Sequence, residues 1–118
     1  MSGLDDLYDK TYHARDYNCA HFVCDAWMIL TGRDITEIME GFLLTARTAR
    51  QSLRRDLKIL RLPESPCIAL MTSHVADPHV GLYLNRKIID ITTAGVRMTP
   101  VDVASVLHQR IGYYTCRR

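Results

Sequence analysis

Two prolines, Pro63 and Pro66, divide the chain into a part with helical hydrophobic spacing and a part with strand-like spacing. Before them, apolar residues recur every three or four positions, which is the spacing of one face of a helix. After them, short apolar runs are separated by turn residues, which is the pattern of β-strands. Helices first and a run of strands afterwards predict an α+β domain with a small antiparallel sheet.

The helical part begins with a well-marked helix over Cys19–Thr31, which Gly32 is placed to end. Asn18 precedes it, and Asn is among the best N-cap residues because its side-chain oxygen accepts from free amides of the first turn. A second helix is expected to start at Asp34 and to continue, as one helix or two, to Leu60. Its apolar stripe consists of Ile38, Met39, Phe42, Leu43, Ala46, Ala49, Leu53, Leu57 and Leu60. Arginines from 47 to 61 are expected on its solvated face, with a partner surface as the minority interpretation.

The strand-like part contains short apolar runs bounded by turn residues. Asn85-Arg86 is a tight connection, so the runs on either side of it predict a hairpin. Residues 96–98 are expected to pair only briefly, and Pro100 is expected at the first position of a short helix ending near Leu107. The expected strands are Cys67–Thr72, His79–Leu84, Lys87–Ile91 and Arg110–Thr115.

The length of 118 residues predicts one domain, residues 12–118, preceded by a short arm over residues 1–11. With 47% hydrophobic and 24% charged residues, general disorder is not expected. The net charge of +2 is too small to indicate nucleic acid binding. We expect no membrane span, since no apolar run approaches about 20 residues. No signal peptide is recognisable at the start, so the chain is expected to be made in a cytosol and to stay soluble, unless a larger assembly or a lysis route carries it out.

Four cysteines, at positions 19, 24, 67 and 116, lack the paired spacing of a zinc site and are expected to be reduced. Cys67 and Cys116 lie in apolar runs and are interpreted as core residues. Cys24 would face another side of the first helix than Cys19. Only Cys19 has a local reason to be reactive, because amides and the helix dipole at a helix start favour the thiolate.

A cysteine nucleophile needs a base, and histidine is the usual one because it titrates near neutrality. His21 lies two positions after Cys19, on another side of the helix, and nothing local orients the loop and helix-end histidines His74 and His108. His79 opens a strand, and the predicted hairpin returns Asp90 beside it. Asp90 could therefore fix the tautomer of His79, as the third member of a triad does.

The segments that carry these residues resemble motifs of the NlpC/P60 family of papain-like cysteine peptidases. Tyr17–Val23 resembles the family's Asp-Cys-Ser-Gly-Phe-Val nucleophile motif. His79–Leu84 resembles its His-Val-Gly-Ile-Tyr-Leu strand almost residue for residue, and Asp90 falls at the position of its third polar residue. The chain has Pro66-Cys67-Ile68 where the family has Pro-Gly-Asp.

The resemblance implies a papain-like fold and a cysteine peptidase with Cys19, His79 and Asp90 as catalytic residues. Tyr17 and Tyr12 are equal, weaker candidates for a hydroxyl near the oxyanion. The resemblance further implies cleavage of peptide bonds in peptidoglycan stem peptides, in the manner of phage tail-associated members, and no metal or organic cofactor. Because the Pro-Gly-Asp motif is altered, a second hypothesis is a non-catalytic phage tail, assembly or host-binding protein that keeps the fold.

Overall fold

The computed structural model describes residues 3–39, 57–73 and 78–116. Its centre is a six-stranded antiparallel sheet with the strand order β1-β6-β2-β3-β4-β5. In chain order the elements are η1 (Gly3–Leu7), α1 (Cys19–Thr31), β1 (Leu57–Leu60), β2 (Cys67–Thr72), β3 (His79–Leu84), β4 (Lys87–Thr92), β5 (Gly95–Pro100), α4 (Val101–Leu107) and β6 (Arg110–Cys116). The predicted α+β class with an antiparallel sheet is therefore confirmed.

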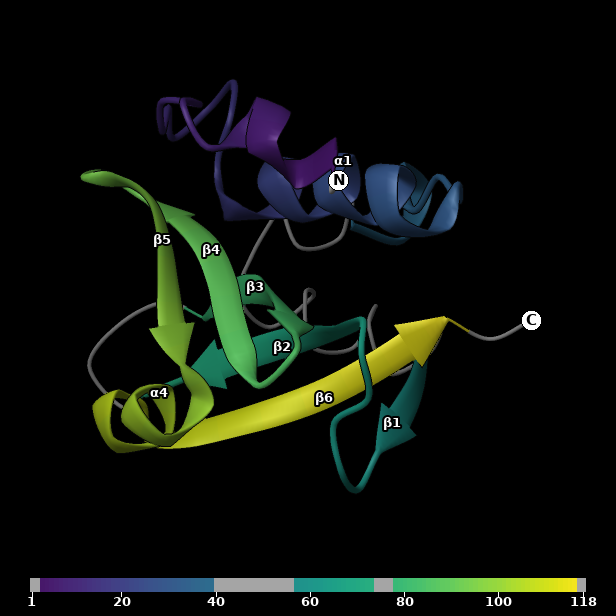
Figure 1. Ribbon diagram of the computed structural model, residues 1–118, viewed down its shortest axis with the longest axis vertical. Coiled ribbons are helices and arrows are strands. Elements are labelled where there is room, and N and C mark those ends of the chain that lie inside the picture. The colour runs from purple at the N-terminus through teal and green to yellow at the C-terminus, as the bar shows by residue number, and fades with distance from the viewer. Residues whose placement is uncertain (1–2, 40–56, 74–77, 117–118) are drawn as a thin grey trace.

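Helices lie on both faces of this sheet. Figure 1 shows α1 and η1 together on one side of the sheet, whereas α4 lies away from them beyond the end of β5. One buried cluster joins α1 to the strands through residues such as Phe22, Val80 and Leu82. A second cluster uses the alternate residues of the same strands, such as Met71 and Tyr83, with Ala104 of α4. β2, β3 and β4 are thus buried on both sides, which explains why their sequences are nearly continuous apolar runs.

The predicted bounds of α1 are confirmed at both ends. Asn18 has extended backbone and caps the helix, and Gly32 has a φ of 75°, the left-handed conformation in which glycine avoids a Cβ clash. The Gly32 N–H donates to the Met28 carbonyl at 2.8 Å. Both ends follow from local residue chemistry, so the sequence predicts them well.

The β3–β4 hairpin is also confirmed. Its two connecting residues, Asn85 and Arg86, have φ angles of 51° and 68°. These values are those of a type I′ turn, whose twist matches that of the strands it joins. The pairing Leu82 with Ile89 sets the register that brings the start of β3 beside the end of β4.

Some sequence-based expectations need correction, and others lie outside the described residues. The helix expected to reach Leu60 is wrong over residues 57–60, which form strand β1 and pair with β6. Residues 36–39 are helical as predicted, but 40–56, with most of the arginine run, are outside the described residues. β5 pairs with β4 over six residues rather than briefly. Pro100 is the last residue of β5 and the N-cap of α4, one position before the one predicted.

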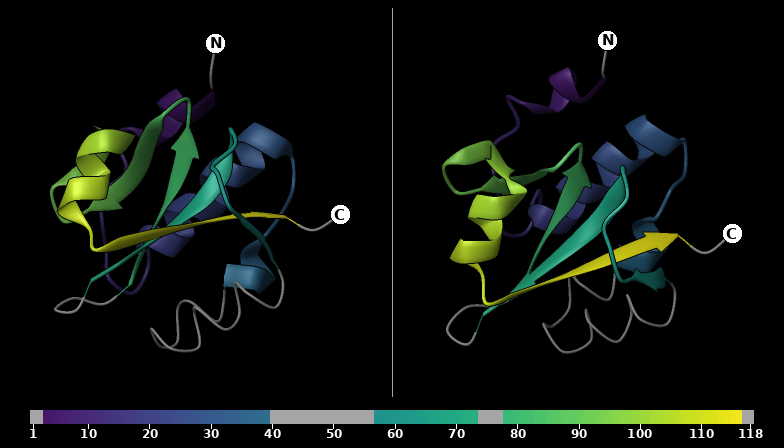
Figure 2. Two further views of the ribbon diagram at one scale, coloured as in Figure 1. Left: turned by 90° about the horizontal axis from the view of Figure 1, so that it is seen from below. Right: turned by 60° about the horizontal axis from the view of Figure 1, so that its bottom comes forward.

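The segment expected to be an arm packs on the body of the domain. Leu4 and Leu7 are 2% and 5% exposed and belong to the cluster around α1. η1 contacts α1, and Figure 2 shows the two elements from two further directions. Within the described ranges, no helix is long and apolar enough to span a bilayer.

Candidate active site

Cys19 is the first residue of α1, and a reciprocal hydrogen-bonded cap fixes its position. The Asn18 side-chain oxygen accepts from the amides of Ala20 at 3.0 Å and His21 at 3.4 Å. In return, His21 Nδ1 accepts from the Asn18 amide at 3.0 Å. The cap engages the two amides after Cys19, and within the described part of the chain the amide of Cys19 itself has no partner in the cap.

His79 is the first residue of β3, and both Asp90 and Cys19 lie close enough to its ring to raise its pKa. Its Nε2 lies 2.6 Å from Asp90 Oδ2. Since Nε2 faces Asp90, Nδ1 is the ring nitrogen that remains for another partner. The structure therefore brings the three residues singled out in the sequence into one cluster, in which His79 is bonded to Asp90 and lies near Cys19.

Asp90 is the one charged residue in the described part of the chain that is buried, with 1% of its surface exposed. Besides His79, Arg97 also contacts the Asp90 carboxylate, and it lies directly opposite Asp90 on β5. Arg97 Nε donates to Oδ1 at 2.8 Å and its Nη2 donates to Oδ2 at 3.1 Å. This forked pair orients the carboxylate and compensates its charge, since two parallel N–H donors match both oxygens.

Gly81 provides the space in which His79 and Asp90 meet. Continuing the β3–β4 register places it opposite Asp90, two residues after His79 on the same face of the strand. A Cβ at this position would lie 3.1 Å from both the Asp90 Cβ and the Ile89 carbonyl oxygen. A side chain at this position would therefore press on the Asp90 side chain and on the Ile89 backbone.

The contacts around His79 favour its charged form. Burial opposes protonation, but the hydrogen bonds to Asp90 and Cys19, together with the charges of both, outweigh burial and raise the pKa of His79 to about 9. Burial likewise acts to raise the pKa of Asp90, yet His79 and Arg97 hold it below its ordinary value. At neutral pH these shifts favour an imidazolium at His79 beside the Asp90 carboxylate.

An open cavity of about 290 Å³ lies on the exposed side of His79. Its walls come from the segment before α1, from β3, β4, β5 and the turn between β4 and β5, and from the end of α4. The lining residues are Tyr12, His79, Ile91, Thr92, Thr93, Arg97 and His108. The site is thus accessible to a ligand, although Cys19 itself is only 9% exposed.

Of the two tyrosine candidates, only Tyr12 lines this cavity. The Tyr17 hydroxyl donates to Asp25 Oδ2 at 2.7 Å, and burial followed by this bond raises the pKa of Tyr17. Its ring stacks on His21 with 6.0 Å between centroids. Tyr17 therefore braces the start of α1, and its hydroxyl is directed along the helix to Asp25.

The remaining histidines and cysteines lie in other surroundings. His13 accepts from the Asp16 amide at 3.1 Å and stabilises the turn before α1, whereas His74 lies outside the described residues. Burial raises the pKa of both Cys24 and Cys67 to about 11, so neither thiol ionises readily.

Arg97 and His108 are the functional candidates that sequence reasoning missed. Arg97 could have been found, because it and Asp90 are placed symmetrically about the Thr93-Ala94 turn and carry opposite charges. His108 could not, because it reaches the cavity only through the packing of α4 at the end of the sheet.

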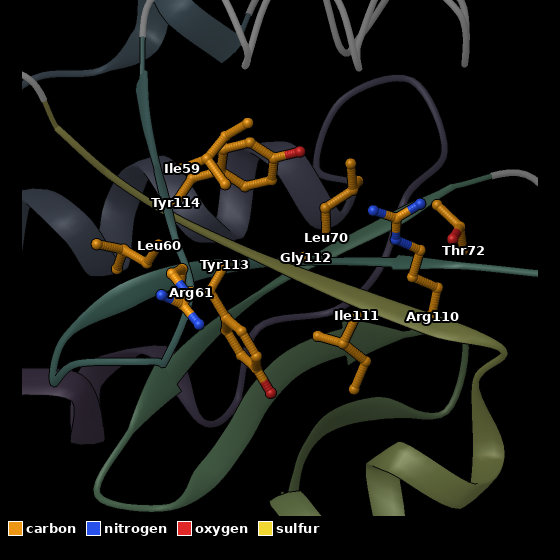
Figure 3. A pocket seen from close by; sticks show the side chains of 10 residues that line it. All are labelled: Ile59, Leu60, Arg61, Leu70, Thr72, Arg110, Ile111, Gly112, Tyr113 and Tyr114. Atoms are coloured by element: carbon orange, nitrogen blue, oxygen red, sulfur yellow. The ribbon is translucent and has the colours of Figure 1, made fainter.

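A second cavity, also of about 290 Å³, lies where β6 meets β1 and β2 (Figure 3). Figure 3 shows the side chains of Arg61, Tyr113 and Arg110 around it. None of Cys19, His79 and Asp90 lines this cavity, so it is separate from the candidate active site.

No protein-family model matches this sequence, and no curated protein sequence matches it either. The function of the protein is therefore inferred from the geometry of the site and from the resemblance of its motifs to those of NlpC/P60 peptidases.

Proposed function

We propose that this protein is a cysteine hydrolase that cleaves peptide bonds, with Cys19 as nucleophile. The observation that carries the proposal is the cluster in which the His79 ring is bonded to the buried Asp90 carboxylate at 2.6 Å and lies near Cys19. A structural cysteine needs no charged partner, whereas a nucleophilic one needs a base that is itself oriented by a third group. The papain-like identity of the fold belongs to this proposal, and the motif resemblance supports it.

In this mechanism the Cys19 thiolate attacks the carbonyl carbon of the substrate and forms a tetrahedral oxyanion. His79, which is an imidazolium at neutral pH, then donates its Nδ1 proton to the leaving amine, and the C–N bond breaks. The resulting neutral imidazole takes a proton from water, which attacks the thioester. The acid product leaves, and His79 again faces a thiolate. Asp90 keeps Nε2 protonated throughout, so that Nδ1 is the nitrogen that transfers the proton.

The oxyanion needs donors aimed at the carbonyl oxygen. The amide of Cys19 at the start of α1 is suited to this role, because the Asn18 cap engages the two following amides and not this one. Tyr12 is the second candidate donor, since it lies in the wall of the cavity beside His79. Tyr17 is not assigned this role, because its hydroxyl is bonded to Asp25.

We propose peptidoglycan stem peptides as the substrate and phage tails as the setting in which the protein acts. Both follow from the resemblance to NlpC/P60 peptidases, above all in the segment His79–Leu84. The tight space around Gly81 beside Asp90 supports the resemblance of this segment, because Gly81 is the glycine of its His-Val-Gly sequence.

A second candidate function is contact with a tail, assembly or host protein without catalysis. The observation in its favour is the outer face of α4, where Val103, Val106 and Leu107 are 47%, 84% and 61% exposed. Clustered exposed apolar side chains are typical of protein contact surfaces.

Hydrolysis of purified stem peptides separates the two functions. We expect turnover by the wild type, loss of turnover in Cys19→Ala, and retention in the matched control Cys24→Ala, which removes the other thiol of the same helix. Absence of turnover in the wild type, together with partner binding that survives Cys19→Ala but not Val106→Asp, would establish the second function instead.

A further inference from the structure

Arg97 is the residue through which β5 contributes to the candidate active site. It lies directly opposite Asp90 in the pairing of β4 with β5, so both side chains leave the sheet on the same face. The Asp90 side chain is 1% exposed, whereas that of Arg97 is 43% exposed. The buried carboxylate is therefore held by a guanidinium that itself reaches the surface.

The two oxygens of the Asp90 carboxylate have different partners. Oδ1 accepts from Arg97 Nε at 2.8 Å, and in the described part of the chain Arg97 is its one partner. Oδ2 lies 2.6 Å from His79 Nε2 and also accepts from Arg97 Nη2 at 3.1 Å. Because Nε and Nη2 belong to one rigid plane, the paired bonds oppose rotation of the carboxylate about its Cβ–Cγ bond.

The setting of that torsion decides how well Asp90 holds His79. The Cβ–Cγ torsion of an aspartate is otherwise broad, and a hydrogen bond weakens steeply as it bends. A carboxylate turned away from the observed setting would therefore leave the bond to His79 Nε2 longer or bent. Since the imidazole ring is rigid, the direction of Nε2 also fixes the direction of Nδ1, the nitrogen to which the proposed mechanism assigns proton transfer.

We propose that Arg97 is a positioning residue of the hydrolase, which acts on His79 through the Asp90 carboxylate and does not contact the reacting atoms. The proposal depends on the proposed hydrolase function, because His79 must be aimed only if it transfers a proton. A neutral amide in place of Asp90 would need no cation beside it, whereas a buried carboxylate does. Asp90 and Arg97 thus form one unit, and neither orients His79 without the other.

Arg97 supplies charge as well as shape, and the two can be separated. The titratable groups around Asp90 are His79 of β3, Arg97 of β5 and His108 at the end of α4, with Cys19 of α1 next to His79. Burial acts to raise the pKa of Asp90, and the bonds and charges of His79 and Arg97 outweigh it. Removing the charge of Arg97 therefore raises the pKa of Asp90, whereas lysine in its place keeps the charge without the planar pair of donors.

Arg97→Gln and Arg97→Lys test the proposal, with Arg110→Gln of β6 as the control for loss of an exposed arginine. We expect both Arg97 variants to slow the alkylation of Cys19 by iodoacetamide at mildly acidic pH about tenfold, the loss of one charged hydrogen bond. Carbon NMR of the Asp90 carboxyl should show a raised pKa in Arg97→Gln but not in Arg97→Lys. Slow alkylation of Cys24 in the same samples reports that the fold is intact, and Arg110→Gln should behave as the wild type.

The proton on His79 Nε2 gives a readout independent of Cys19, because its downfield NMR shift reports a short bond to the carboxylate. We expect this shift in the wild type and its loss in both Arg97 variants. Wild-type alkylation of Cys19 in Arg97→Lys, or an unchanged Nε2 proton in that variant, would overturn the positioning role and leave the hydrolase function intact. If Cys19 reacts no faster than Cys24 in the wild type, the hydrolase function fails and the positioning role fails with it, even where the variants lose the Nε2 shift.

Discussion

Replacing Asp90 by Asn removes one charge from the site while keeping the shape of the side chain. In the wild type the pKa of His79 is about 9 against an ordinary 6.5. This difference corresponds to about 3 kcal/mol in favour of the imidazolium. The hydrogen bond to Asp90 is the largest influence that raises the pKa, and burial, which lowers it, is unaffected by the substitution. We therefore expect the pKa of His79 to fall by about 1–3 in Asp90→Asn.

The titration of His79 can be followed by NMR of its ring protons in both proteins. Asp9→Asn is the matched control, because Asp9 is exposed and should leave His79 unchanged. A His79 pKa near 9 in Asp90→Asn would refute the assignment of Asp90 as the residue that stabilises the imidazolium.

The same substitution changes how stability depends on pH. A raised folded-state pKa means that His79 contributes stability that is complete below its ordinary pKa of 6.5 and is lost as the pH rises through about 9. The lowered pKa of Asp90 contributes stability that is present above its ordinary value and is lost as the pH falls through the folded-state pKa. Urea unfolding across this range should show both losses in the wild type, and both should be smaller in Asp90→Asn.

Three further substitutions test how the site is positioned. Gly81→Ala places a Cβ 3.1 Å from the Ile89 carbonyl oxygen, which cannot easily move. We expect the free energy of unfolding, measured in urea, to fall by about 1–3 kcal/mol and Asp90 to be displaced. Unchanged stability would contradict the close approach. Arg86→Gly relieves a φ of 68° and should raise the urea midpoint by the equivalent of about 1 kcal/mol, whereas a lower midpoint would argue against the type I′ turn. Asn18→Ala removes the side-chain cap of α1. We expect the free energy of unfolding to fall by about 1 kcal/mol and Cys19 to be alkylated more slowly. Alkylation at the wild-type rate would show that the cap does not position the thiol.

Elements with local signals were predictable from the sequence. The helix over Cys19–Thr31 was predicted at both ends because Asn18 and Gly32 act on the nearest turns of backbone. The β3–β4 hairpin was predictable because apolar runs flank the Asn85-Arg86 turn on both sides. The same hairpin made the meeting of His79 with Asp90 predictable, since it involves only one turn and one pairing register.

Features that depend on distant parts of the chain were not predictable in this way. Leu57 and Leu60 fit a helical stripe as well as a strand, and it is their pairing with Cys116 and Tyr113 of β6 that decides for the strand. The hydrogen bond from Tyr17 to Asp25 depends on the angle at which the chain enters α1, and the sequence does not specify that angle. The cavity beside His79 brings together Tyr12, Arg97 and His108, and no local pattern relates these three residues.

The central claim is that His79 activates Cys19, and the rate at which iodoacetamide alkylates each thiol at mildly acidic pH tests it most directly. Cys24 is the internal reference, because burial raises its pKa to about 11 and keeps it protonated under these conditions. The thiolate–imidazolium pair predicts that Cys19 is alkylated much faster than Cys24 and that this advantage disappears in His79→Asn. Equal rates at Cys19 and Cys24 in the wild type, or an advantage of Cys19 that persists in His79→Asn, would contradict the claim.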